Sequence, residues 1–352
     1  MLQPRLFNDI ILRPRLIRKP GAVAPSSKVA IYLIFPQFGV QETHLHSLRY
    51  IVENGYSPLI ISNLPLSDND FVQLKPLAWR IVQRANFGYD FGGYRDGFLD
   101  LKDVLPNLQR LVFLNDSIWF PLQNSANWLR RAEESGKDVY GSELHREILP
   151  PALIDFETAE WKADKRQRRL YIPSFAISIG PRVFRSPKYA KFWKKLRISD
   201  GKGRTVRRGE HGHSNWLREH GFTYDALLKS ADLDFVLSQM PADILDDIWK
   251  YFLTDHRNAS VVSTHKELCE NAVDDKLRVR RRKFIQMYSA RTGHAIYIPH
   301  FAITQQAYPF LKKRANSPNG TNIAKLADII RDLNDPLSPA MLAEHQLRYG
   351  DH

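Results

Sequence analysis

The sequence predicts an α/β fold with a mostly parallel sheet flanked by helices and a mainly helical C-terminal extension. Short apolar, β-branched runs alternate with helical patterns up to about residue 224, and helical patterns dominate beyond about residue 230. A chain of 352 residues is long enough for one large α/β domain with an appended unit. We therefore divide it into an N-terminal arm (1–27), an α/β domain (28–230) and a helical region (231–352).

Strand and helix patterns alternate along the α/β domain, which predicts parallel pairing because each helix returns the chain to the same edge of the sheet. The predicted strands are Lys28–Phe35, Tyr56–Ser62, Trp79–Gln83, Leu111–Leu114, Asp138–Gly141, Tyr171–Ile179 and Phe222–Tyr224. The predicted helices are Val40–Asn54, a short helix opened by Ser67–Asp70, Tyr94–Leu101, Pro121–Glu134, a helix from Pro181 that carries Phe192 and Trp193, and His211–His220.

The formal net charge of +13 predicts attraction to anions: nucleotide phosphates, nucleic acid or anionic lipid head groups. Basic residues concentrate at Lys162–Arg169, Lys188–Arg208 and Arg278–Lys283. The single cysteine, Cys269, cannot form an intramolecular disulfide, and we expect a buried structural thiol in a cytoplasmic protein. Prolines interrupt the basic N-terminus, and no apolar run is long enough to span a membrane, so a soluble or peripheral protein is expected.

The loop after strand Trp79–Gln83 is the first candidate site, since ligands of open α/β sheets bind beyond the carboxyl ends of the strands. Its glycines would let the backbone approach a diphosphate, and its polar side chains could bind ribose, sugar hydroxyls or phosphate. The candidate donor-binding residues are Asn86, Gly88, Asp90, Gly92, Gly93 and Arg95. A tight strand-to-helix turn is the alternative. The spacing matches neither a Walker A loop nor the dinucleotide pattern GxGxxG.

The second candidate site is Asn115-Asp116-Ser117, directly after an apolar strand. Asp116 could hold Mg²⁺ or Mn²⁺ against a nucleotide diphosphate, with Asn115 and Ser117 as oxygen ligands, or it could bind sugar hydroxyls without a metal. Capping of the next helix is the structural alternative, because Asn, Asp and Ser are also preferred N-cap residues.

A third candidate is Glu210, near the start of a predicted helix and beside arginines that keep its carboxylate ionised. Such a group suits a general base that deprotonates an acceptor hydroxyl, and His211 and His213 are alternative bases. Capping residues on an exposed turn are the competing interpretation. His44 and His46 lie two apart on a predicted helix, so we expect surface residues and not metal ligands.

The string ANFGYDFGGYRDG, followed by LVFLNDSIWFPL, resembles the rhamnan synthesis F family of bacterial polysaccharide proteins. The family's Asn-x-Gly-x-Asp-x-Gly loop corresponds to Asn86, Gly88, Asp90 and Gly92, and its Asn-Asp-Ser strand end to Asn115–Ser117. The later segments YIPSFAISIGPRVF and GEHGHSNWLREHGF resemble the family's continuation, so the resemblance covers roughly Lys28 to Tyr224.

This resemblance implies a GT-A-like, Rossmann-type glycosyltransferase that moves rhamnose or another deoxyhexose from a nucleoside diphosphate donor. The implied acceptor is a lipid-linked glycan of a cell-surface polysaccharide (O-antigen, capsule or rhamnan), at the anionic inner face of the membrane. The sequence departs from the GT-A pattern in three places: Ser62-Asn63 replaces the acidic base-reading residue, Asn115-Asp116-Ser117 replaces the Asp-x-Asp metal motif, and Glu210-His211 replaces a Glu-Asp pair.

Two other function classes remain open. One is a basic nucleic-acid-binding or regulatory protein, although the sequence carries no recognised nucleic-acid motif and no nucleic-acid partner is expected. The other is a non-catalytic scaffold of a polysaccharide assembly complex.

Overall fold

The structure is a computed structural model that describes residues 4–145, 148–149, 156–157, 162–163, 171–254, 259–270, 273–314 and 319–350. The chain forms two compact units. The first comprises residues 1–116, 127–142 and 171–226, and the second comprises 117–126, 143–170 and 227–352. This division differs from the predicted one, since the N-terminal arm belongs to the first unit and two internal segments belong to the second. Most of the predicted polar connection 143–169, with residues 164–169 of its basic cluster, lies outside the described residues.

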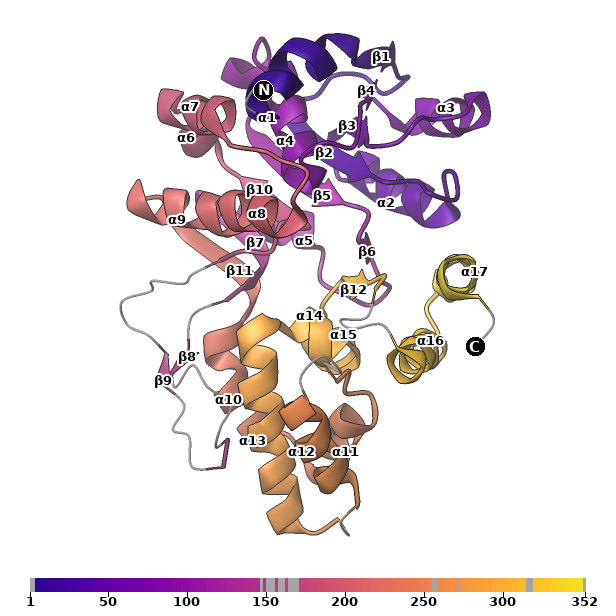
Figure 1. Cartoon of the computed structure of the whole chain (residues 1–352), viewed down its shortest axis with the longest axis vertical. Helices are drawn as coiled ribbons and strands as arrows, with labels where there is room; N and C mark the ends of the chain where they lie inside the picture. The colour runs from indigo at the N-terminus through magenta and orange to yellow at the C-terminus, as the bar shows by residue number, and fades with distance from the viewer. Residues whose placement is uncertain are drawn as a thin grey trace. The chain divides into compact units, whose positions relative to one another are not determined.

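The sheet confirms the predicted α/β class (Figure 1). Its strand order is β1-β4-β3-β2-β5-β10-β7-β11. The strands are β1 (Ile17–Pro20), β2 (Lys28–Ile34), β3 (Ser57–Ser62), β4 (Arg80–Gln83), β5 (Arg110–Asn115), β7 (Val139–Leu144), β10 (Ala176–Ile179) and β11 (Tyr224–Lys229). The central strands β4, β3, β2 and β5 are parallel, whereas β1 pairs antiparallel with β4, and β10 pairs antiparallel with β5 and β7.

Helices cover this sheet, and the strand sequences reflect that. From Val29 to Ile34 every residue of β2 is buried, as expected for a parallel strand covered on both faces. The α-helices of the first unit are α1 (Pro4–Phe7), α2 (Glu42–Glu53), α3 (Asp68–Leu74), α4 (Tyr89–Asp100), α5 (Trp128–Glu134), α6 (Pro181–Phe184), α7 (Pro187–Lys195), α8 (Lys202–Val206) and α9 (Gly212–Glu219). The shorter helical turns are η1 (Asn8–Leu12), η2 (Arg13–Arg15), η3 (Lys75–Leu77), η4 (Leu105–Asn107) and η5 (Arg207–His211).

Three predicted helices differ from the structure. Helix α4 begins at Tyr89, five residues before the predicted Tyr94, because Gly88 adopts a left-handed conformation (φ 80°) as its N-cap. The predicted helix 121–134 is helical only as α5, and the predicted helix from Pro181 is split into α6 and α7. Pro187 causes this split, because proline starts a helix but cannot continue one.

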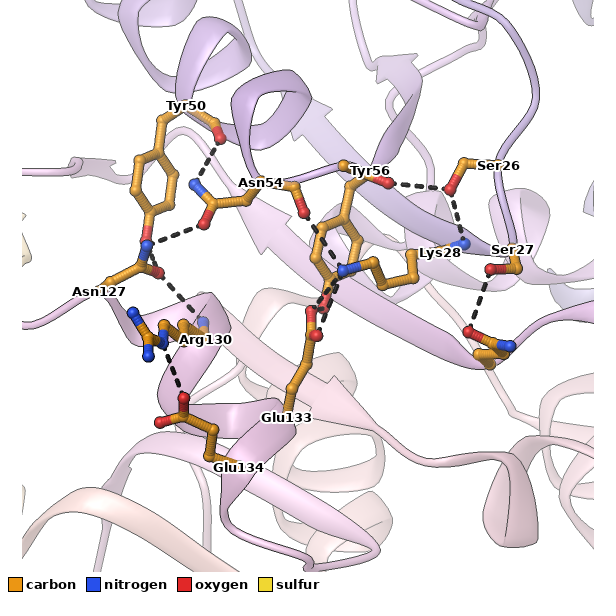
Figure 2. Close-up of polar contacts among 12 residues, drawn as sticks. Ser26, Ser27, Lys28, Tyr50, Asn54, Tyr56, Asn127, Arg130, Glu133 and Glu134 are labelled. Carbon is orange, nitrogen blue, oxygen red and sulfur yellow. Dashed lines mark hydrogen bonds and ion pairs between the residues drawn. The ribbon is translucent and has the colours of Figure 1, made fainter.

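At the amino ends of β2 and β3, a polar network attaches α5 to the sheet (Figure 2). Lys28 Nζ lies 3.0 and 3.2 Å from the two carboxylate oxygens of Glu133. The Tyr56 hydroxyl donates to the same carboxylate at 2.7 Å. Burial, followed by the hydrogen bond to Glu133 and the charge of that carboxylate, raises the pKa of Tyr56 above its ordinary value. This edge of the sheet is therefore held by matched opposite charges.

The second unit confirms the predicted mainly helical C-terminal region (Figure 1). Its helices are η6 (Ser230–Asp232), α10 (Leu233–Ser238), α11 (Ala242–Lys250), α12 (Ala259–Glu270), α13 (Asp275–Thr292), α14 (His294–Tyr297), α15 (Pro299–Gln306), α16 (Gly320–Leu333) and α17 (Ser338–Tyr349). The strands β6 (Ile118–Trp119) and β12 (Leu311–Lys312) pair antiparallel, as do β8 (Ile148–Leu149) and β9 (Lys162–Ala163). None of the described helices has the length and apolar character needed to cross a membrane.

The prediction of a buried Cys269 is wrong, because the residue is exposed on α12. Its neighbour Leu268 occupies the buried face of that helix, and consecutive helical residues point in different directions.

Candidate functional site

The site is built on the carboxyl end of β5, which lies between β2 and the segment that precedes β10. The backbone N–H of Asn115 donates to the carbonyl of Phe175 at 3.2 Å, and that of Asp116 donates to the carbonyl of Leu33 at 3.0 Å. Because β10 runs antiparallel to β5, its first residues lie at the edge where β5 ends. Side chains from three chain segments can therefore meet at this point.

Asp116 is held in one orientation by two donors. Its Oδ2 atom accepts the backbone N–H of Phe35 at 2.6 Å and lies 3.2 Å from Nε2 of His44. The backbone N–H of Gln41 donates to Nδ1 of His44 at 2.9 Å, so the ring proton sits on Nε2 and points at the carboxylate. The Asp116 side chain is 16% exposed, so the carboxylate is positioned and still reaches solvent.

The prediction that His44 is a surface residue is wrong, since His44 is 2% exposed. A signal for it exists in the sequence, because His44, Leu48 and Ile51 follow an i, i+4, i+7 spacing and form the buried face of α2. His46 is half-buried on the same helix. The contact of His44 with Asp116 joins residues 72 positions apart, so the spacing of the two histidines could not reveal it.

A continuous set of hydrogen bonds joins the other predicted residues. Nδ2 of Asn115 donates to Oδ2 of Asp90 at 3.1 Å, and Asn115 also hydrogen-bonds the Tyr94 hydroxyl. That hydroxyl donates to the carbonyl of Ser174 at 2.8 Å. The backbone N–H of Ser174 in turn donates to Oε1 of Glu210 at 2.6 Å. Asp90 and Glu210, which are 120 residues apart in sequence, thus belong to one network.

The hydroxyl of Tyr94 is influenced by the charges of three predicted carboxylates. Burial raises the pKa of Tyr94 well above its ordinary value, and negative charges raise it further. Those charges belong to Asp90, Asp116 and Glu210. The hydroxyl therefore stays protonated and acts as a hydrogen-bond donor at the centre of the cluster. We call Asp90, Asn115, Asp116 and Glu210, with Tyr94 between them, the carboxylate cluster.

Glu210 lies in the π-helical turn η5, which continues directly from α8 into α9. The backbone of Gly209 lies against the Phe91 ring of α4, where an added Cβ would come within 2.2 Å of the ring. Only glycine allows this approach, so the turn is docked on α4 and Glu210 is placed beside Ser174. Turns of π-helix are frequent at functional sites.

The glycines after β4 have a structural role in packing α4. An added Cβ on Gly92 would lie 2.1 Å from the carbonyl oxygen of Phe87, and one on Gly93 would lie 2.4 Å from a methyl group of Leu33. Both residues lie inside α4, where they let the helix pack closely on the turn and on the sheet. Gly88 is the N-cap of α4, and the predicted contact of the three glycines with a diphosphate stays a prediction.

Arg95, which is predicted to bind the donor, is buried and paired within the protein. Its guanidinium donates to both carboxylate oxygens of Asp9 at 2.6 and 2.9 Å and to the carbonyl of Trp193, and the residue is 2% exposed. Arg84, which the sequence analysis did not select, binds Asp96 at 2.9 Å and Oδ1 of Asn63 at 2.6 Å. Arg84 also donates to the carbonyl of Phe87 at 2.7 Å and so braces the loop before α4, whereas Arg95 joins α4 to Asp9 and to α7.

The remaining predicted residues make other contacts. His213 is 1% exposed and contacts the Tyr189 hydroxyl at 2.8 Å. Burial lowers the pKa of His213 to about 3, so this predicted base is a core residue.

His211 is half-buried and packs on Tyr171 with ring centres 4.8 Å apart. Asn86 is exposed, and the Ser117 hydroxyl accepts a hydrogen bond from Lys312 within the second unit.

The predicted metal site at Asp116 is not formed by protein groups alone. Among the described residues, no group of three His, Cys, Asp or Glu side chains is arranged to hold a metal ion. Oδ2 of Asp116 is already engaged by two N–H donors. A metal held by Asp116 against a nucleotide diphosphate, with Asn115 and Ser117 as oxygen ligands, stays a prediction, and no chemical step below is assigned to it.

Comparison with solved structures gives weak similarity to sugar transferases. The mannosyltransferase Ktr4p from S. cerevisiae in complex with GDP has 11% identity and a TM-score of 0.33, over 56% of this chain and 71% of that one. A putative nucleotide-diphospho-sugar transferase from Desulfovibrio desulfuricans G20 has 14% identity and a TM-score of 0.27, over 73% and 98%. Similarity at this level carries no argument about the fold or the reaction.

Sequence comparison is more informative. An uncharacterized protein, y4gN, of Sinorhizobium fredii (strain NBRC 101917 / NGR234) is 26% identical over 213 residues, which is 60% of this chain. The chain spans 51% of the length of that relative. Residues 59–250, more than half of the chain, match the family of rhamnan synthesis protein F. The match contains Asp90, Asp116 and Glu210. The chain therefore belongs to the rhamnan synthesis protein F family.

Proposed function

We propose that this protein is a glycosyltransferase that moves a sugar, rhamnose or another deoxyhexose, from a nucleoside diphosphate donor to a growing bacterial surface polysaccharide. Family membership supports the reaction class. The observation that carries the proposal is the set of hydrogen bonds at the carboxyl edge of the sheet that joins Asp90 to Glu210, with Asp116 at the end of the same strand as Asn115. Open α/β sheets bind their ligands at this edge.

The chemistry of glycosyl transfer matches such a cluster. As the bond to the leaving diphosphate breaks, the sugar ring gains positive charge, and fixed carboxylates stabilise that charge. Asp116, oriented by Phe35 and His44, is assigned to the donor sugar. Asp90 lies in the first turn of α4 and is assigned to hydroxyl groups of the donor sugar.

Glu210 is assigned as the general base. Its Oε1 atom is held by the Ser174 N–H, which fixes the direction of the carboxylate. A carboxylate fixed in this way can accept the proton of an acceptor hydroxyl as that oxygen attacks the anomeric carbon. In-line attack would invert the configuration at this carbon.

The proposed acceptor is a lipid-linked glycan, and the proposed place of reaction is the anionic inner face of the cytoplasmic membrane. A net charge of +13 supports attraction to such a surface, since each basic residue near it contributes about 1 kcal/mol. No step of the proposed reaction is assigned to a divalent cation, and the thermal-shift experiment tests whether one is needed for nucleotide binding.

A thermal-shift panel of nucleoside diphosphates, each with and without Mg²⁺ or Mn²⁺, tests the donor class. A ligand that binds the folded state at about 100 times its Kd stabilises it by about 2.7 kcal/mol. We expect one nucleotide to raise the Tm of the wild type and to raise that of Asp116→Asn less. If the rise in Tm requires the cation, a metal ion takes part in nucleotide binding at this site.

The same panel separates the alternatives. A protein that binds labelled oligonucleotide in a salt-sensitive manner, and no nucleoside diphosphate, would be a nucleic-acid-binding protein. Nucleotide binding without transfer to any acceptor and without donor hydrolysis would indicate a scaffold.

A further inference from the structure

A second charged feature of the first unit involves α7 and α9. A surface cavity of about 700 Å³ is present there. Five Lys or Arg residues line it: Lys188, Lys191, Lys195, Arg197 and Arg208. Among the described residues that line the cavity there is no Asp or Glu. The cavity therefore concentrates positive charge within one small volume.

The spacing on α7 explains this concentration. Lys188, Lys191 and Lys195 are separated by three and four residues, so they share one face of the helix. Within the described part of the chain, none of these lysines forms an ion pair. Like charges on neighbouring helical positions repel one another, and a bound anion would remove that cost.

The basic residues of α13 differ from those of α7, because acidic side chains pair with them. Arg278 lies 3.0 Å from Asp246, and Arg280 lies 2.7 Å from Glu157 and 2.8 Å from Glu267. These cations are neutralised within the second unit. The cations of the α7 cavity are not neutralised in this way, which points to an external anion.

Aromatic rings form the apolar part of the cavity wall. Trp216 stacks on His220 with ring centres 4.2 Å apart and lies 5.8 Å from Phe192. The wall suits a sugar ring or an alkyl chain next to the anion. The volume is typical of a site for one small ligand. An extended groove that follows about 4–16 nucleotides is the usual form of a single-strand site, so the cavity favours one head group over nucleic acid.

We propose that this cavity binds the phosphate groups of the acceptor, a phosphate or diphosphate ester whose apolar or sugar portion packs on Trp216. The identification of the ligand as the acceptor rests on the proposed function. Arg208 lies in the same turn, η5, as Glu210. An acceptor anchored by its phosphates at this turn would be held beside the proposed general base.

The test measures binding of inorganic pyrophosphate by calorimetry to the full chain. We compare Lys191→Glu/Lys195→Glu in the cavity with Lys194→Glu/Lys202→Glu as a control. The control changes net charge equally, and both of its lysines are exposed and outside the cavity. We expect the cavity variant to lose affinity by about tenfold or more and the control to change less than about threefold. Equal losses, or no loss in the cavity variant, would overturn the proposal.

Binding to lipid vesicles distinguishes a membrane lipid from a soluble ester as the source of the phosphate. Binding to phosphatidylglycerol vesicles that pyrophosphate displaces would assign the cavity to a lipid head group. Binding of pyrophosphate without binding of vesicles would assign it to a soluble phosphorylated acceptor. An oligonucleotide that binds more tightly than pyrophosphate and depends on Lys191 and Lys195 would replace the proposal with nucleic-acid binding.

This experiment is independent of the donor. Nucleotide binding should be unchanged in Lys191→Glu/Lys195→Glu. If no nucleoside diphosphate binds but pyrophosphate binding depends on the cavity, the proposed function fails and the anion site stands. If nucleotides bind and the cavity substitutions do not change the affinity for pyrophosphate, only the proposal of the anion site fails.

Discussion

The two edges of the sheet use tyrosine and carboxylate groups in opposite ways. At the amino edge, Lys28 and Tyr56 both contact Glu133, so the negative charge has a cation 3.0 Å away (Figure 2). At the carboxyl edge, three carboxylates act on the single hydroxyl of Tyr94. Matched charges stabilise a fold, whereas like charges placed together repel and must be held there by the surrounding structure.

That difference indicates where function lies. The amino-edge network joins α5 to the sheet and is complete without a ligand. The carboxyl-edge cluster is held by backbone donors from Phe35 and Ser174 and by His44. Carboxylates held in fixed positions at the edge where open α/β sheets bind their ligands are typical of sites that stabilise charge in a substrate. The following substitutions test this contrast.

The largest effect is expected for Asp116→Asn. The amide keeps the size of the carboxylate but removes the negative charge from the donor site, so transfer should fall by about 100-fold or more. The loss of charge-assisted hydrogen bonds from Phe35 and His44 should lower the free energy of unfolding by about 1–3 kcal/mol. Turnover with the donor found by thermal shift and denaturant unfolding measure the two effects. Unchanged turnover would remove Asp116 from the mechanism.

Glu210→Gln should have the next largest effect. Removal of a general base lowers kcat by about 100-fold, while donor affinity stays close to that of the wild type. Steady-state kinetics with varied donor and a direct nucleotide titration measure the two quantities. If donor affinity falls as much as kcat does, Glu210 serves only to position Ser174.

His44→Phe tests a positioning role. The substitution keeps an aromatic side chain but removes the Nε2–H that orients Asp116, so we expect kcat to fall by about tenfold, with donor affinity less affected. His46→Phe on the same helix is the matched control and should leave kcat unchanged. A similar loss in both variants would show that α2 is merely destabilised.

The smallest effect on activity is expected for Glu133→Gln, the same chemical change as Glu210→Gln at the opposite edge. It weakens a partly exposed ion pair with Lys28, so unfolding should become easier by at most about 1 kcal/mol. Transfer should not change. A loss of activity comparable to that of Glu210→Gln would show that the two edges are not functionally distinct.

Much of the site could be predicted because strand ends are visible in the sequence. Asn115 and Asp116 follow an apolar run, and Asp90 follows another strand, so their meeting at one edge is a consequence of parallel pairing. Glu210 could be selected by its chemistry and by family resemblance. Its distance from Asp116 could not be predicted, because it depends on how η5 docks on α4.

The differences between prediction and structure share one physical cause, which is that tertiary packing engages side chains that look available in the sequence. Gly92, Gly93 and Arg95 look like ligand-binding residues in a linear sequence, but they lie inside α4 and pack on the sheet or bind Asp9. His44 and His213 are both buried, and their contacts decide their roles, because His44 contacts Asp116 whereas His213 contacts the Tyr189 hydroxyl in the core.

The sequence alone determined the α/β class, the order of most strands and helices, and the excess of positive charge, because these follow from local periodicity and composition. Only the tertiary structure decided which polar residues meet. Hydrogen bonds such as those from Asn115 to Asp90 and from Ser174 to Glu210 join segments distant in sequence. Their formation depends on strand register and helix packing, which no local pattern encodes.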